Sequence, residues 1–187
     1  MVSAWFLDRS PADQKLPNKP SPTVHVGVNE LAKFGVDYYK ITNTANFDEE
    51  LNEFRQKHGY DYSDEITINK EKLPNYDDKV KMFYEEHIHT DDEVRYVVEG
   101  SGYFDVRNAN DEWIRILVES GDLLVLPAGI YHRFTVDTND YIKVVRLFKG
   151  VPVWTAHNRP AEEMDARLKY VQKYAEGQQT RSAQVSL

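Results

Sequence analysis

Residues 85–107, EEHIHTDDEVRYVVEGSGYFDVR, decide the fold, and residues 121–134, GDLLVLPAGIYHRF, complete it. Successive side chains of an extended chain point to opposite faces, so residues two apart share a face. His87, His89 and Glu93 have the same parity, and a bend at the Thr-Asp-Asp run before Glu93 keeps them facing one interior. The first stretch therefore predicts strands with candidate metal ligands on their inner face.

The second stretch supplies a further candidate ligand, His132, in a short apolar and aromatic run. Turn signals bound this run, with an Ala-Gly pair before it and an Asp-Thr-Asn run after it. An antiparallel sheet that folds back on itself brings such a strand beside the first. We therefore expect His87, His89, Glu93 and His132 to converge on one metal ion.

The types of ligand narrow the choice of metal. Imidazole suits iron, nickel, zinc and copper, and a carboxylate beside it favours a harder divalent ion. Four protein ligands leave two cis positions of an octahedral shell for a chelating substrate, or for a substrate and oxygen. A pair of histidines two apart can also be a surface coincidence, and we interpret His25, His58 and His157 as surface or hydrogen-bonded residues. The matched parity of Glu93 makes the coincidence the weaker interpretation of His87 and His89.

Composition limits the class of protein. A chain of 187 residues, of which 41% are hydrophobic, can bury the core of a single domain. We expect one domain over residues 1–178 and a disordered tail over residues 179–187. The net charge of −8 argues against a nucleic-acid partner or an anionic membrane surface.

The absence of cysteine excludes disulfides and thiolate metal sites and suits a reducing compartment. The first ten residues, MVSAWFLDRS, lack the basic region and long apolar stretch of a signal peptide, and we find no transmembrane segment. We therefore expect a cytoplasmic protein that is not embedded in a membrane, and we expect a monomer.

The remaining elements surround the two stretches. We expect a strand at residues 4–7, short helices from Asn29 and from Phe47, and a strand from Lys79 into the histidine pair. A final helix is expected to begin near Asn158 and to end at Gly177. Turn signals at short intervals, which we place at residues 101–102, 108–111, 120–122, 128–129 and 137–140, indicate a mainly β fold, an antiparallel barrel or jelly roll.

Two spacings resemble the motifs of the cupin superfamily. The first is His87-x-His89, three residues, Glu93, six residues and Gly100. The second is Gly121, five residues, Pro127-x-Gly129, two residues and His132. Lys81 replaces the glycine that usually opens the first motif, and Val136 replaces the asparagine that usually closes the second. Neither position is a metal ligand, so the departures leave the predicted metal site intact.

The resemblance extends to the acireductone dioxygenase family of the animal-like type. It is carried by LPNYDDKVKMFYEEHIHTDDEVRYVVEGSGYFDVR, DEWIRI, PAGIYHRFTVDTNDYIKVVRLF, PVWTAHNRPA and the opening MVSAWFLD. The resemblance covers nearly the whole chain. The proline-rich segment at residues 17–22 and the tail after Gly177 match least well.

This resemblance implies an enzyme of methionine salvage that cleaves 1,2-dihydroxy-3-oxo-5-(methylthio)pent-1-ene with O2. It implies 2-oxo-4-methylthiobutanoate and formate as products with Fe(II), one ion per chain, and 3-methylthiopropanoate, CO and formate with Ni(II). The ligands do not choose between the two ions, because both accept imidazole and carboxylate. The resemblance also adds the nucleus as a second location.

The same resemblance gives roles to further side chains. Arg95 shares the parity of Glu93, and it would steady the oxyanion of the bound substrate. The alternative is that Arg95 pairs with an internal acid, Glu99 or Asp105. The candidates for the apolar wall of a substrate pocket are Phe83, Phe134 and Trp154. The alternative is that these aromatic side chains simply pack in the core. The proton-accepting group is left open among Glu93, Glu99 and water.

Two other classes of function remain open at this stage. One is a different metal-dependent cupin enzyme, such as an isomerase or another dioxygenase, with the same ligands and another pocket. The other is a non-enzymatic interaction protein that keeps the metal as a structural element. A metal that never exchanges its water would favour the second class.

Overall fold

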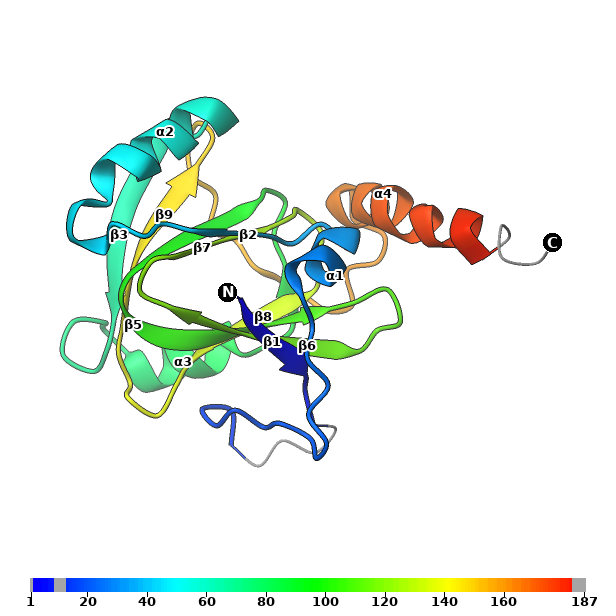
Figure 1. Ribbon diagram of the computed structural model, residues 1–187, viewed down its shortest axis with the longest axis horizontal. Coiled ribbons are helices and arrows are strands. Elements are labelled where there is room, and N and C mark those ends of the chain that lie inside the picture. The colour runs from blue at the N-terminus through cyan, green and yellow to red at the C-terminus, as the bar shows by residue number, and fades with distance from the viewer. Residues whose placement is uncertain (1, 9–12, 183–187) are drawn as a thin grey trace.

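The longest strand, β5 (Glu93–Arg107), organises the sheet of the computed structural model (Figure 1), which describes residues 2–8 and 13–182, with side chains up to Tyr174. The first half of β5 pairs with β7 (Asp122–Leu126) and β9 (Ile142–Phe148). The second half pairs with β6 (Trp113–Glu119) and β8 (His132–Val136). One strand therefore belongs to both halves of a barrel.

A bend in the middle of β5 closes the barrel. The register with β9 shifts between Val97 and Glu99, as at a β-bulge, and Gly100 has a φ of +76°. A Cβ atom at Gly100 would lie 2.2 Å from the carbonyl oxygen of Tyr141, so the bend has room only for glycine. The hairpin turn predicted at residues 101–102 is wrong, because β5 continues through these residues after bending.

The outer strands extend the two halves of the barrel. In one half, β1 (Ser3–Phe6) pairs with β6, while β4 (His87–Ile88) pairs with both β8 and β10 (His157–Asn158). In the other half, β2 (Asp37–Lys40) pairs with β7, and β3 (Tyr62–Ile68) pairs with β9. All these pairs are antiparallel, so the predicted mainly β antiparallel architecture is confirmed.

The hydrophobic core fills the barrel and sets the alternation of its strands. Inward-facing residues of β6 and β7 are almost fully buried, among them Ile114, Ile116, Leu124 and Leu126. A second cluster, around Tyr96, packs beneath α2 (Asp48–His58). Both clusters pack against β5 and fix the position of its first residues. The candidate site lies at this end of the strand.

The helices lie outside the barrel (Figure 1). α1 (Val28–Lys33) and the long α4 (Asp165–Ser182) lie on the side opposite α2 in this view, and α3 (Tyr76–Phe83) lies beside β8. A 3-10 turn, Thr44–Asn46, precedes α2. Among the described residues, no helix has the length and apolar character needed to cross a membrane.

Two further expectations about the elements are corrected by the structure. The segment from Lys79 is not a strand but the second half of α3, in which Tyr76 and Val80 lie one turn apart and are both buried. The last helix begins at Asp165 and continues past Gly177 to Ser182, into the predicted tail. The rest of that tail, residues 183–187, lies outside the described residues.

Candidate metal centre

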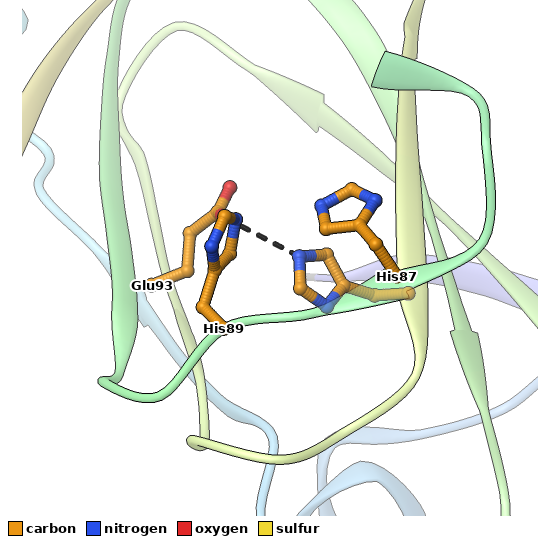
Figure 2. Close-up of side chains that lie close together, drawn as sticks. His87, His89 and Glu93 are labelled. Atoms are coloured by element: carbon orange, nitrogen blue, oxygen red, sulfur yellow. Dashed lines mark hydrogen bonds and ion pairs between the residues drawn. The ribbon is translucent and has the colours of Figure 1, made fainter. Parts of the chain in front are cut away.

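The candidate ligands come from three places in the sheet and meet at one point. His87 lies in β4, His89 follows it, Glu93 begins β5 and His132 begins β8. His87 and His132 are direct cross-strand partners. One ligand atom from each of the four residues lies within 4.8 Å of the others, and Figure 2 shows His87, His89 and Glu93 pointing toward one another. The predicted convergence is therefore present in the structure.

Two hydrogen bonds from backbone amides hold together the loops that carry these ligands. The amide of Ala128 donates to Asp92 Oδ1 at 3.0 Å, and the amide of Gly129 donates to the carbonyl of His89 at 3.0 Å. Gly129 has a φ of +81°, and a Cβ there would lie 2.2 Å from the carbonyl oxygen of Ala166. The bend after His89 and the turn before His132 therefore fix each other, and only glycine fits between them and α4.

Each imidazole is oriented by a hydrogen bond from its Nδ1 atom. The acceptors are the carbonyl of Glu85 at 2.7 Å for His87, that of Thr155 at 2.8 Å for His89, and that of Ile130 at 2.9 Å for His132. A carbonyl oxygen only accepts, so each Nδ1 carries the proton and each neutral ring keeps a lone pair on Nε2. Such a bond is the usual partner of a metal-bound histidine.

Glu93 adds a carboxylate to these lone pairs. Its Oε2 atom lies 3.1 Å from His89 Nε2 and 3.3 Å from His132 Nε2. With the rings neutral, acceptor atoms face acceptor atoms, an arrangement that a metal cation or a shared proton among them stabilises. The donor set of three imidazoles and one carboxylate therefore fits a divalent metal such as iron or nickel.

The electrostatics favour a neutral His87 and an ionised Glu93, the states in which these two residues can bind a metal. Burial, with the neighbouring His132, lowers the pKa of His87 to about 4, so this ring is neutral at neutral pH. Burial alone would raise the pKa of Glu93, but the charge of Arg95 and the close contacts with His132 and His89 hold it well below its usual range. Burial alone would lower the pKa of His89, but the carboxylate of Glu93 raises it, so a proton competes with a metal ion for the Nε2 atom of His89.

Arg95 pairs within the site. Its Nη2 atom lies 3.4 Å from Glu93 Oε1, and its Nη1 atom donates to the carbonyl of Val94 at 3.0 Å. The alternative partners lie elsewhere: Glu99 is exposed and accepts a hydrogen bond from Tyr141, and Asp105 pairs with other arginines. Burial lowers the pKa of Arg95, and Glu93 opposes that effect. The guanidinium thus faces the cavity beside the candidate ligands.

A cavity of about 150 Å³ opens beside the four ligands. Phe83, Phe134 and Trp154 all line it, together with Arg95. The rings of Phe83 and Phe134 meet edge to face at 6.4 Å, whereas Trp154 is 37% exposed at the mouth. The lining of the cavity therefore combines the polar ligands and Arg95 with apolar aromatic side chains. Phe83 reaches it from α3, so the strand parity that first suggested this residue does not apply.

Sequence reasoning missed several residues of the cavity wall. The structure adds Ile66, Ile68, Met82, Phe104, Val144, Arg146 and Ala156. The alternation along β3 and β9 could have indicated the aliphatic members, but the pairing of these strands with each other was not predicted. His25, His58 and His157 lie outside the cavity, and a larger hollow of about 750 Å³ has His25 and Lys173 in its wall, apart from the four ligands.

Comparisons with known proteins found a matching family and several similar enzymes. The model of the ARD/ARD' family matches residues 3–156. Acireductone dioxygenase of Homo sapiens is 53% identical over 177 residues, which cover 94% of this chain and 99% of that protein. Acireductone dioxygenase of Branchiostoma floridae is 54% identical over 171 residues, covering 91% of this chain and 96% of that protein.

A solved structure shares the fold. It is "Acireductone dioxygenase from Bacillus anthracis with cadmium ion in active center", with a TM-score of 0.66 and 23% sequence identity. The match covers 83% of this chain and 98% of the bacterial chain. At this level of identity the likeness concerns the fold, and it confirms the cupin-type barrel expected from the two motifs.

Proposed function

The chain belongs to the ARD/ARD' family, and from this premise we propose that it binds one Fe(II) or Ni(II) ion and cleaves acireductone with O2 in methionine salvage. The activity is that of an acireductone dioxygenase, an oxidoreductase. The observation that carries the proposal is the meeting of three imidazole lone pairs and the Glu93 carboxylate at one point.

The proposed ligands are His87, His89, Glu93 and His132. When bound, the metal supplies Lewis acidity and a template for two substrate oxygens. Imidazole and carboxylate accept both Fe(II) and Ni(II), so the proposed products depend on the ion that is loaded. They are 2-oxo-4-methylthiobutanoate and formate for the Fe(II) form, and 3-methylthiopropanoate, CO and formate for the Ni(II) form.

Arg95 is proposed to stabilise the anionic oxygens of the bound substrate. Its guanidinium lines the cavity and has Glu93 as its ion-pair partner at 3.4 Å. A fixed positive charge in a partly desolvated cavity acts more strongly on a substrate oxyanion than it would in water. Among the acids considered for proton removal, Glu99 does not line the cavity, so Glu93 and water are the proposed proton acceptors.

The apolar side of the cavity is proposed to hold the methylthioalkyl tail. Phe83 and Phe134 form its wall, and Trp154 covers its mouth. Aromatic side chains bury a thioether well and exclude water from the reacting oxygens. The tail and the two oxygens would then bind at opposite ends of one cavity.

Product analysis tests the proposed function. The protein is prepared metal-free, reconstituted with Fe(II) or Ni(II), and mixed with acireductone and O2. We expect oxygen consumption above the spontaneous rate, the keto acid with Fe(II), and CO with Ni(II). His87→Ala and Glu93→Ala should abolish turnover. Metal binding without any turnover above the spontaneous rate would contradict the substrate while leaving the metal site intact.

The cellular setting is a further part of the proposal. We expect a monomer in the cytoplasm and the nucleus, with the small molecule and O2 as its partners and no nucleic acid. The net charge of −8 supports the last point. Size-exclusion chromatography with light scattering, and fractionation of cells, check these expectations.

A further inference from the structure

A row of charged side chains crosses three strands beside the candidate site. Arg95 of β5 is the direct cross-strand partner of Arg146 of β9, and Arg146 is in turn the partner of Asp64 of β3. Both arginines line the same cavity. Like charges directly opposite each other destabilise a sheet, so this arrangement needs a compensating contact.

Asp64 provides that contact on the side away from the ligands. Arg146 donates to both of its carboxylate oxygens, from Nε at 2.7 Å and from Nη2 at 2.5 Å. The hydroxyl of Tyr62 also donates to Asp64, at 3.0 Å. A two-point contact of this kind fixes the plane of a guanidinium as well as its position. Arg146 is therefore held as a rigid surface in the cavity wall.

Trp154 rests on that surface. The Cζ atom of Arg146 lies 4.0 Å from the centroid of the indole, and Arg95 Cζ lies 5.5 Å from it. Trp154 belongs to a segment without regular structure, in which Val151 is 86% exposed. Stacking on a fixed guanidinium is thus a strong restraint on the position of the indole.

The same segment reaches the metal centre. Thr155, the residue after Trp154, accepts the hydrogen bond from His89 Nδ1 at 2.8 Å. The path from Arg146 through Trp154 and Thr155 therefore ends at a candidate ligand. A second effect acts on Arg95, because the positive charge of Arg146 on the neighbouring strand opposes movement of Arg95 toward Arg146.

We propose that Arg146, clamped by Asp64, is a positioning residue: it holds Trp154 over the mouth of the cavity, keeps Thr155 on His89, and keeps Arg95 facing the ligands. The identity of the substrate rests on the proposed function, whereas the positioning role rests on the contacts alone.

A matched control lies on the same two strands. Lys143 of β9 pairs with Glu65 of β3 at 3.3 Å, and neither residue lines the cavity. This ion pair links the strands as Arg146 and Asp64 do, but it does not touch Trp154. Lys143→Met therefore measures the effect of losing a cross-strand ion pair without removing a contact to Trp154.

The first experiment uses the metal-free protein and does not depend on turnover. The chain has three tryptophans, so the indole N–H resonances can be assigned with Trp154→Phe. We expect Arg146→Met and Asp64→Asn to shift the Trp154 resonance, Arg146→Lys to shift it less, and Lys143→Met to leave it in place. An unmoved Trp154 resonance in folded Arg146→Met would overturn the proposal.

The second experiment measures turnover of acireductone by the reconstituted enzyme. We expect Arg146→Met to lower kcat/KM between about tenfold and a hundredfold, the loss that misplaced catalytic groups produce. Arg146→Lys should recover part of it, and Lys143→Met should stay near the unmodified protein. A shifted indole with unchanged kcat/KM would show that the contact has no positioning role in catalysis. If the unmodified protein does not turn over acireductone, the proposed function fails, and the indole shift still decides whether Arg146 positions Trp154.

Discussion

At the start of β5, Glu93 faces three imidazoles, and near the end of the same strand Asp105 faces two guanidinium groups. Both clusters are largely buried, and both combine one carboxylate with nitrogen-bearing side chains. They differ in which groups meet. In the first cluster acceptor atoms meet other acceptor atoms, so a bound ion could join them. In the second cluster each carboxylate oxygen already accepts a hydrogen bond from an arginine of the protein.

The Asp105 cluster pairs every acceptor with a donor. Arg115 donates from Nε to Asp105 Oδ1 at 2.7 Å and from Nη2 to Oδ2 at 2.8 Å, and Arg133 adds a donor to Oδ2 at 2.9 Å. The remaining Nη1 of Arg115 donates to the carbonyls of Gln14 and Leu16. The cluster thus anchors the segment that follows β1 and requires no ligand.

The candidate metal centre instead gathers acceptors. Each Nδ1 proton is used by a backbone carbonyl, so only Nε2 lone pairs and the Glu93 carboxylate meet in the centre. Burial penalises such a group of acceptors unless a cation joins them. A surplus of acceptor groups, rather than burial or charge alone, therefore distinguishes the candidate metal centre from the Asp105 cluster.

The largest effect is expected from Glu93→Gln. The substitution removes the only anionic ligand, so metal content and oxygen consumption should fall together, the latter by about a thousandfold or more, which corresponds to ~4 kcal/mol. Metal analysis and an oxygen electrode measure the two quantities. Glu99→Gln, on the same strand but exposed, is the control. Full metal content with full activity in Glu93→Gln would remove this residue from the ligand set.

Asp105→Asn tests the other cluster. It leaves two arginines without their carboxylate, and Asp105 is 1% exposed, so we expect a loss of about 3–5 kcal/mol in the free energy of unfolding. Denaturant titration measures this loss, with Glu65→Gln at the exposed pair as the control, expected to lose less than about 1 kcal/mol. Turnover per folded, metal-loaded molecule should be retained. A variant with normal stability and no turnover would reverse the roles of the two clusters.

Metal loading should separate the clusters thermodynamically. An ion present at a hundred times its dissociation constant should stabilise the folded chain by about 2.7 kcal/mol. Thermal unfolding with and without Fe(II) or Ni(II) tests this. Asp105→Asn should retain the full stabilisation, whereas Glu93→Gln should lose it. Equal stabilisation of both variants would mean that the ion binds elsewhere.

The smallest effect concerns Tyr96, which belongs to neither cluster. Its buried hydroxyl has no hydrogen-bond partner among the described residues. Tyr96→Phe should therefore raise the free energy of unfolding at neutral pH by about 1 kcal/mol. Denaturant titration detects the change. A loss of stability instead would reveal a partner for the hydroxyl.

The same residue contributes a dependence on alkaline pH. Burial, and then Glu50, raises the pKa of Tyr96 from 10.0 to about 12. The unfolded chain ionises first, so the contribution to stability is complete below pH 10, declines from there, and is lost as the pH rises through about 12. Tyr96→Phe should flatten part of the decline. An identical decline in both proteins would exclude Tyr96 as its source.

The convergence of the four candidate ligands was predictable because its signals are local. His87, His89 and Glu93 share a parity, and His132 follows a Pro-x-Gly turn, so each position depends on its immediate neighbours. The same is true of the short strands and of α2, whose apolar spacing and terminal Gly59 lie within one segment. The resemblance to a family added the substrate, which no spacing could supply.

The errors lie where local signals fit two structures. Val80, Met82 and Tyr84 alternate like a strand, but Tyr76 and Val80 are also one helical turn apart, and burial of both beside β8 favours α3. Ser101 and Gly102 resemble a turn, yet β5 continues through them because β6 and β8 supply hydrogen-bond partners on both sides. Only packing could choose between these alternatives.

The sequence by itself therefore indicated the four candidate ligands and determined the mainly β architecture, because alternation along a strand and the residues of a turn are properties of neighbouring positions. The tertiary structure decided which strands pair, and with that the bend of β5, the orientation of the His89 ring by the carbonyl of Thr155, and the contact of Arg146 with Asp64. Those features join residues far apart in the chain. Their energies depend on distances that exist only after the barrel has closed.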